Sequence, residues 1–280
     1  MKKIKIVADS SSDVLKIDGV DLESVPLKII TAEREFVDDT SLDVAEMVDY
    51  LLKYKGKSQT SCPNPEDWLA AFGDAEEIYC ITITSSLSGS YNSACRAKEL
   101  YEKKHEGARV CVIDSLSTGP EMALIIEKLR EMVLAEMSFD EISEKISEYK
   151  KSTGLLFVLE SMQNLANNGR VSKLVAKFAG LMNIRVLGKA SDVGTLETLD
   201  KPRGKKMTVQ KVVDRLLELG YAGGRMFITH CFNEEAVSEL CEAIKSKFKG
   251  VKIAIDLCRG LCSFYAEKGG MLIGFEKATV

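Results

Sequence analysis

Short aliphatic and β-branched runs alternate along the chain with segments whose apolar residues recur at helical spacing. Residues 4–8, 81–84 and 110–113 are such runs, and each is followed by small polar residues and then by a helical pattern. This repeated strand–loop–helix order predicts an α/β fold with a parallel sheet in the first half of the chain. Residues 25–30 form another expected strand, at a sheet edge because Pro26 cannot donate a ladder hydrogen bond.

The second half of the chain mixes strand and helix patterns less regularly. Composition shifts near residues 150–154, and 280 residues are long for one domain, so we expect domains at 1–152 and 153–280, the second of mixed α/β type. The expected strands are 154–159, 184–187, 195–198, 225–230, 251–257 and 271–275. The expected helices include 174–181, 209–219 and 234–248.

Four segments place small hydroxyl or acidic residues between a strand or loop and a helix. They begin at Asp9, Thr60, Ser85 and Asp114. The loops after parallel strands lie together at one sheet edge, where ligands bind. Helix capping alone explains any one of these segments. Four within 120 residues favour the interpretation that at least two of them line a site.

Residues 81–94 carry the clearest binding signal. They pass from a strand pattern through Ser85–Ser90, which are small residues and include Gly89, into a helical pattern. The first N–H groups of such a helix are unpaired and carry the positive end of its dipole. The segment therefore predicts an anion-binding site.

Composition and charge narrow the class of protein. With 45% hydrophobic and 29% charged residues, the chain is an ordinary globular protein. It has no run of 18 uncharged apolar residues, so we expect no membrane span, and its net charge of −4 argues against nucleic acid as a partner. The N-terminus passes directly into a strand pattern, so we expect no signal peptide. Eight cysteines, none in a C-x-x-C pair, predict buried, reduced thiols in the cytoplasm.

Candidate catalytic groups are few. Histidine occurs only at His105 and His230, and no G-x-S-x-G elbow supports a triad of His230 with Ser88. Neither a P-loop nor a G-x-G-x-x-G motif is present, so no cofactor is predicted. A hydrolase or transferase that acts on a phosphate or carboxylate substrate through Asp9, Asp114 and His230 remains an alternative. A binding protein needs only hydroxyls, helix termini and an apolar pocket.

Cys258 and Cys262 suggest a third hypothesis, a redox or metal sensor. Their C-x-x-x-C spacing suits a pair of ligands, but neither a second pair nor a nearby histidine completes a four-ligand site. No metal ligands are therefore predicted.

Several segments, taken in order, resemble the DegV family. They are residues 9–13, 25–27, 60–63, 86–91, 169–171 and 201–204. DegV proteins are bacterial fatty-acid-binding proteins, and some of them present an acyl chain to a fatty acid kinase. The resemblance covers nearly the whole chain. It implies a two-domain α/β fold with a long-chain fatty acid in a tunnel between the domains.

The resemblance also implies a site for the fatty-acid head group. The carboxylate would contact the hydroxyl of Thr60 or Ser61 and that of Ser88, together with the main chain around Gly89, and Ser90 is expected among the ligand-binding residues. This expectation agrees with the anion site predicted from residues 81–94.

Near the C-terminus the chain departs from the family pattern. Where the family has a histidine close to the head group, this chain has Glu267, followed by Lys268. A carboxylate facing a carboxylate is unfavourable, so Glu267 turns away, is protonated, or leaves the role to Lys268. Arg170 and Arg203 match family arginines that either face the kinase or steady the site.

Simple estimates show how much the tail and the head group of a fatty acid would each contribute to the binding free energy. Burying about 16 carbons at ~0.8 kcal/mol per methylene gives on the order of 10 kcal/mol, which association costs of roughly 4–15 kcal/mol largely offset. Hydrogen bonds to the carboxylate add about 1.5–3 kcal/mol each. The tail therefore supplies most of the affinity and the hydroxyls orient the ligand. The expected tunnel wall comprises the 174–182 segment, Phe157, Phe264 and Tyr265.

Overall fold

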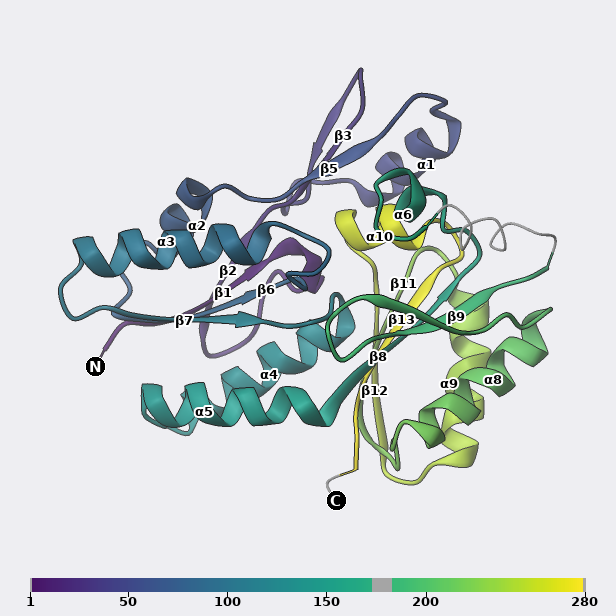
Figure 1. Ribbon diagram of the computed structural model, residues 1–280. Coiled ribbons are helices and arrows are strands. Elements are labelled where there is room, and N and C mark those ends of the chain that lie inside the picture. The colour runs from purple at the N-terminus through teal and green to yellow at the C-terminus, as the bar shows by residue number, and fades with distance from the viewer. Residues whose placement is uncertain (1, 173–182, 279–280) are drawn as a thin grey trace.

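The computed structural model describes residues 2–172 and 183–278, and within them the strands form three sheets (Figure 1). The first sheet is parallel throughout, as the sequence predicts, with the order β2-β1-β6-β7. Helices α2 and α3 cover one face, and α4 and α5 cover the other (Figure 1). The bounds are β1 Ile4–Asp9, β2 Asp21–Val25, β6 Glu77–Thr82, β7 Arg109–Asp114, α2 Pro65–Phe72, α3 Ser90–Lys104, α4 Pro120–Leu134 and α5 Phe139–Tyr149.

The central strands of this sheet are apolar on both faces, which explains their continuous hydrophobic runs. Ile6 and Ala8 of β1 pack into the cluster with α4 and α5, whereas Val7 packs into the cluster with α2 and α3. All three side chains are fully buried. Such burial on both faces is typical of a parallel sheet covered by crossover helices.

The second sheet belongs to the later part of the chain and is mixed, again as predicted. Its order is β10-β9-β8-β13-β11-β12, and only β11 and β12 pair in parallel. Helices α8 and α9 pack with it in one apolar cluster. The bounds are β8 Thr153–Leu159, β9 Val186–Ala190, β10 Leu196–Asp200, β11 Gly224–His230, β12 Val251–Leu257, β13 Met271–Glu276, α8 Lys205–Glu218 and α9 Glu234–Lys247.

A small antiparallel sheet, β4-β3-β5, corrects one expectation. The strand predicted at residues 25–30 is two strands, since β2 ends at Val25 and β3 begins at Lys28. Between them, the backbone N–H of Leu27 donates to Ser10 Oγ at 3.0 Å and not to a sheet partner. Pro26 lacks an N–H, so the chain can leave one sheet here and enter another. The bounds are β3 Lys28–Ile30, β4 Glu35–Val37, β5 Gln59–Ser61 and α1 Val44–Lys53.

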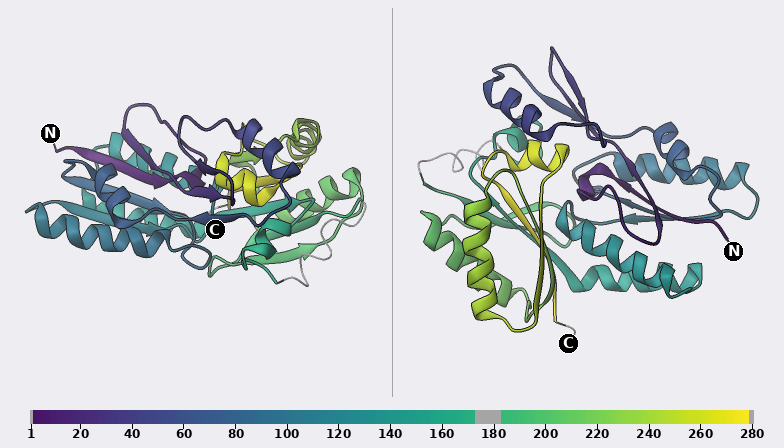
Figure 2. Two further views of the ribbon diagram at one scale, coloured as in Figure 1. Left: turned by 90° about the horizontal axis from the view of Figure 1, so that it is seen from above. Right: turned by 180° about the vertical axis from the view of Figure 1, so that it is seen from behind.

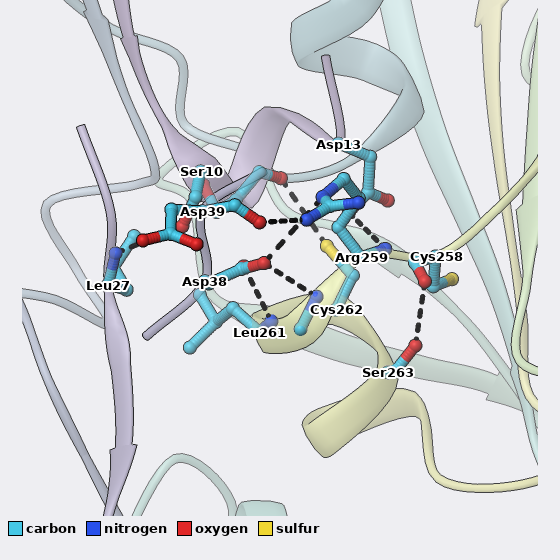
Figure 3. Close-up of polar contacts among 12 residues, drawn as sticks. Ser10, Asp13, Leu27, Asp38, Asp39, Cys258, Arg259, Leu261, Cys262 and Ser263 are labelled. Carbon is cyan, nitrogen blue, oxygen red and sulfur yellow. Dashed lines mark hydrogen bonds and ion pairs between the residues drawn. The ribbon is translucent and has the colours of Figure 1, made fainter. Parts of the chain in front are cut away.

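The short helix α10 (Gly260–Ala266) lies where the parts of the molecule meet (Figure 2). Asp38, in the loop after β4, accepts hydrogen bonds from the backbone N–H groups of Gly260 and Leu261, both at 2.8 Å (Figure 3). Arg259 donates its backbone N–H to Asp13 Oδ1 at 2.9 Å and points its guanidinium at Asp38 and at the carbonyl of Asp39. These contacts fix α10 against the first half of the chain.

Helix α4 also contacts both larger sheets. The domain boundary after residue 152 therefore stays a prediction. The helix expected at 174–181 lies outside the described residues. No helix of the described residues is long and apolar enough to cross a membrane.

Candidate functional site

A cavity of about 320 Å³ lies between the parallel sheet, the small sheet, α10 and the mixed sheet. This volume falls at the lower end of the roughly 300–1,000 Å³ typical of small-molecule sites. Its described lining is mostly apolar and comes from both halves of the chain. The apolar side chains are those of Leu27, Ile83, Leu87, Leu155, Phe157, Leu159, Leu165, Leu196, Leu261, Ala266 and Leu272.

Several polar groups of this lining come from segments that contact one another, and we call them the polar end: Thr60, Ser88, Gly89, Arg170 and Tyr265. Thr60 reaches it from β5, where it pairs with Ile29 of β3. The expectation that this segment lies at the edge of the parallel sheet was therefore wrong, because Thr60 belongs to the small antiparallel sheet. Its Oγ1 lies 2.8 Å from the hydroxyl of Tyr265 on α10. Ser61 also lines the cavity, and its hydroxyl donates to the carbonyl of Cys62 at 3.3 Å.

The turn between β6 and α3 brings Ser88 and Gly89 to the polar end. Ser88 Oγ accepts a hydrogen bond from the backbone N–H of Ser90 at 3.3 Å. A Cβ at position 89 would lie 3.2 Å from Cys62 Sγ, so glycine allows this turn to approach the Thr60 segment closely. Helix α3 begins at Ser90, so its positive end lies beside the polar end. The start of a helix is a place where an anion can bind, so the anion site predicted from residues 81–94 stays a prediction that this geometry allows.

The side chain of Ser90 differs from the expectation. Ser90 is fully buried, and its hydroxyl donates to Asp9 Oδ2 at 2.6 Å and does not line the cavity. Asp9 also accepts hydrogen bonds from Ser11 Oγ and from the backbone N–H of Ile83. Burial raises the pKa of Asp9, although these hydrogen bonds oppose the shift. The Ser90 side chain therefore connects the turn between β6 and α3 to the end of β1 and does not face a ligand in the cavity.

The structure places Arg170 and Arg203 in different surroundings. Arg170 lines the cavity, donates through Nε to the carbonyl of Leu87 at 3.0 Å and also donates to the carbonyl of Asn168. Its guanidinium thus lies next to Ser88. Arg203 is exposed, forms a backbone bridge with Ile184 and is not part of the cavity lining.

Glu267 turns away from the cavity, the first of the three alternatives that the sequence left open. Its Oε1 accepts a hydrogen bond from the backbone N–H of Asn164 at 3.0 Å, at the start of α6 (Gln163–Asn167). Lys268 is exposed. Neither Glu267 nor Lys268 is part of the described cavity lining, so Lys268 does not take over the head-group role that the sequence also left open for it.

Sequence reasoning missed the role of Tyr265, which it named only as a wall residue. Thr60 and Tyr265 are 205 positions apart, and no local pattern joins them. Burial raises the pKa of Tyr265, while the Thr60 hydrogen bond and the charge of Arg170 act in the opposite direction. Of the other wall candidates, Phe157 lines the cavity, Phe264 does not, and the 174–182 segment falls among the residues that are not described.

The groups proposed for catalysis are engaged elsewhere. Asp114 Oδ1 accepts backbone N–H groups of Ser85 and Leu116 at 3.1 and 3.0 Å. His230 Nδ1 accepts the N–H of Asn233 at 3.1 Å, and burial lowers the pKa of His230. Neither these two residues nor Asp9 lines the cavity.

The cysteine pair is buried at the α10 junction. Burial raises the pKa of the Cys258 and Cys262 thiols well above the ordinary value, and both are unpaired thiols. Within the described part of the chain, no group of three or more His, Cys, Asp or Glu side chains is arranged to hold a metal ion.

Comparison with known proteins agrees with this architecture. The family model described as "Uncharacterised protein, DegV family" matches residues 3–278. A DegV domain-containing protein of Streptococcus pneumoniae is 45% identical over 276 residues, which cover 97% of this chain and 98% of that protein.

Two solved structures are similar over nearly their whole length. One is a Eubacterium eligens DegV family protein loaded with heptadecanoic acid, with a TM-score of 0.96, 43% identity and coverage of 98% of this chain and 100% of that one. The other is the S. pneumoniae Fatty Acid Kinase (Fak) B3 protein loaded with linoleic acid, with a TM-score of 0.96, 45% identity and coverage of 99% and 100%.

Proposed function

The chain belongs to the DegV family, and on that premise we propose that it binds a long-chain fatty acid in the cavity, with the carboxylate at the polar end. The observation that carries the proposal is the cavity itself. Its lining is mostly apolar, and the polar end, which includes Thr60, Ser88 and Arg170, lies beside the start of α3. An anionic head group with an apolar tail matches both parts.

The similar structures support this assignment. The E. eligens protein holds a saturated fatty acid and the S. pneumoniae protein holds linoleic acid. Both ligands combine a carboxylate with a long chain. In this chain the hydroxyls of Thr60 and Ser88 would donate to the carboxylate, and the aliphatic lining would cover the tail.

We further propose that the protein is a carrier and not itself an enzyme, and that it presents the acid to a fatty acid kinase. Asp9, Asp114 and His230, the groups considered for catalysis, are each engaged with neighbouring residues away from the cavity. The similar S. pneumoniae structure is described as the B3 protein of Fatty Acid Kinase (Fak), which supports a kinase as the partner. We expect the protein to act in the cytoplasm, where its eight thiols would stay reduced.

Mass spectrometry of the native protein tests the proposal. The protein is purified without detergent, and its organic extract is compared with the extract of the same protein after delipidation and reloading with hexadecanoic acid. We expect a near-stoichiometric long-chain acid in the first extract and hexadecanoic acid in the second. Absence of acid from both extracts would contradict the proposed function.

A further inference from the structure

We propose that Tyr265 is a positioning residue that directs the hydroxyl proton of Thr60 toward the head group, so that the polar end selects a carboxylate. The inference rests on the proposed function, since it concerns how the acid's carboxylate is held. The observation behind it is the 2.8 Å contact between Thr60 Oγ1 and the Tyr265 hydroxyl, both part of the cavity lining.

The position of Tyr265 is set by contacts at both ends of α10. At the start of the helix, the carboxylate of Asp38 accepts the N–H groups of Gly260 and Leu261 (Figure 3). Near the end, the carbonyl of Phe264 accepts a hydrogen bond from the side chain of Asn164 on α6 at 2.8 Å. The phenol therefore meets Thr60 from a helix that is anchored independently of any ligand.

Counting the protons of the two hydroxyls shows which one is free to bind a ligand. Two hydroxyls bring two protons, and their mutual hydrogen bond uses one of them. A phenol is a stronger donor than an alkyl hydroxyl, so Tyr265 donates and Thr60 accepts. Burial raises the pKa of Tyr265, which keeps its proton in place. Among the described residues, Tyr265 is the one hydrogen-bond partner of the Thr60 side chain, which leaves the proton of Thr60 for a ligand.

Ser88 is arranged in the same way. Its oxygen already accepts the N–H of Ser90, so its own proton remains available. The polar end then presents two hydroxyl protons, one from Thr60 and one from Ser88, to a group that only accepts. An ionised carboxylate is such a group. Hydrogen bonds in series strengthen one another, so the Tyr265–Thr60–carboxylate chain is stronger than an isolated Thr60 contact.

The test uses hexadecanoic acid labelled with ¹³C at the carboxyl carbon. The variant is Tyr265→Phe, and the matched control is Tyr50→Phe, which removes a hydroxyl 3.4 Å from Thr31 Oγ1 away from the cavity. We expect Tyr265→Phe to weaken binding by about three- to tenfold, the effect of one hydrogen bond. The titration of the ¹³C resonance should also show a higher pKa for the bound carboxyl group, because its ionised form has lost a hydrogen bond that stabilised it.

A double-mutant cycle with Thr60→Val shows whether Tyr265 acts through Thr60. In the Thr60→Val background, Tyr265→Phe should change neither the affinity nor the ¹³C titration midpoint. An equal effect in both backgrounds, or an affinity loss without a shift of the midpoint, would overturn the inference. The inference would also be overturned if the ¹³C titration midpoint of Tyr265→Phe equalled the midpoints of wild type and Tyr50→Phe.

Failure of this inference is distinct from failure of the proposed function. Wild-type protein that binds no hexadecanoic acid refutes the proposed function. Wild-type protein that binds the acid with a midpoint insensitive to Tyr265→Phe refutes only the role of Tyr265.

Discussion

The carboxylate of Glu267 accepts a hydrogen bond from the backbone N–H of Asn164 at 3.0 Å, so its charge faces the first turn of α6 and not the cavity. The side chain of Asn164 returns the contact by donating to the carbonyl of Phe264 at 2.8 Å. These two hydrogen bonds tie the end of α10 to α6. Arg170 lies shortly after α6, and its backbone N–H donates to the carbonyl of Leu165 in that helix.

Replacing Glu267 should therefore affect stability and not the charge seen by the ligand. Glu267→Ala leaves the N–H of Asn164 without its acceptor and should lower the free energy of unfolding by about 0.5–2 kcal/mol, as loss of a helix cap does. Urea unfolding measures this change. Glu267→Gln keeps an acceptor oxygen and should be milder. In Glu267→Gln the affinity for hexadecanoic acid should stay within about twofold; a large gain in affinity would mean that the carboxylate faces the ligand after all.

Thr60 and Ser88 should contribute to head-group binding without supporting the fold. Because hydrogen bonds to a charged group contribute about 1.5–3 kcal/mol each, Thr60→Ala combined with Ser88→Ala should weaken acid binding at least about tenfold. Titration calorimetry measures the affinity, and thermal unfolding of the ligand-free protein monitors the fold. Ser147→Ala, which removes an exposed hydroxyl on α5, is the control. Unchanged affinity in the double variant would remove these two residues from the head-group site.

The apolar lining should set the length of the acyl chain. Leu196 is only partly buried and lines the cavity, so Leu196→Phe can extend into it with little strain. We expect the variant to favour shorter acids, since each methylene excluded from the cavity costs ~0.8 kcal/mol. Competition between tetradecanoic and octadecanoic acids measures the preference. Leu217→Phe, at an exposed position, should leave the preference unchanged.

The buried carboxylate of Asp13 should make stability depend on pH. Burial and the nearby charge of Asp38 raise the pKa of Asp13 from its ordinary value of 3.8 to about 7, against the hydrogen bond from Arg259. The native state then holds a proton that the unfolded state has lost. Stability should therefore fall as pH rises between these values, by at most about 1.4 kcal/mol per pH unit for this one proton.

Asp13→Asn keeps an acceptor for the Arg259 N–H and removes the titration. Urea unfolding at pH 5, 6, 7 and 8 should show a shallower decline for this variant than for wild type. Burial raises the pKa values of Asp9, Asp38 and Glu121 in the same direction, so some decline should remain. A decline as steep as that of wild type would refute the role of Asp13.

The strand–loop–helix order predicted the parallel sheet because apolar runs on both faces are a local property of the chain. The same local pattern placed Ser88 and Gly89 at the start of α3, and the structure brings both to the polar end. The single edge strand predicted at residues 25–30 was wrong, because the chain leaves one sheet after Val25 and enters another at Lys28.

Only the tertiary structure decided what the individual side chains do. Ser90 resembles its neighbour Ser88 in sequence, yet its hydroxyl turns to Asp9 on an adjacent strand. Glu267 turns to α6, and Tyr265 meets Thr60 across 205 positions. Backbone patterns follow from interactions within a few residues, whereas the direction of a hydroxyl or carboxylate depends on partners that folding brings from far along the chain.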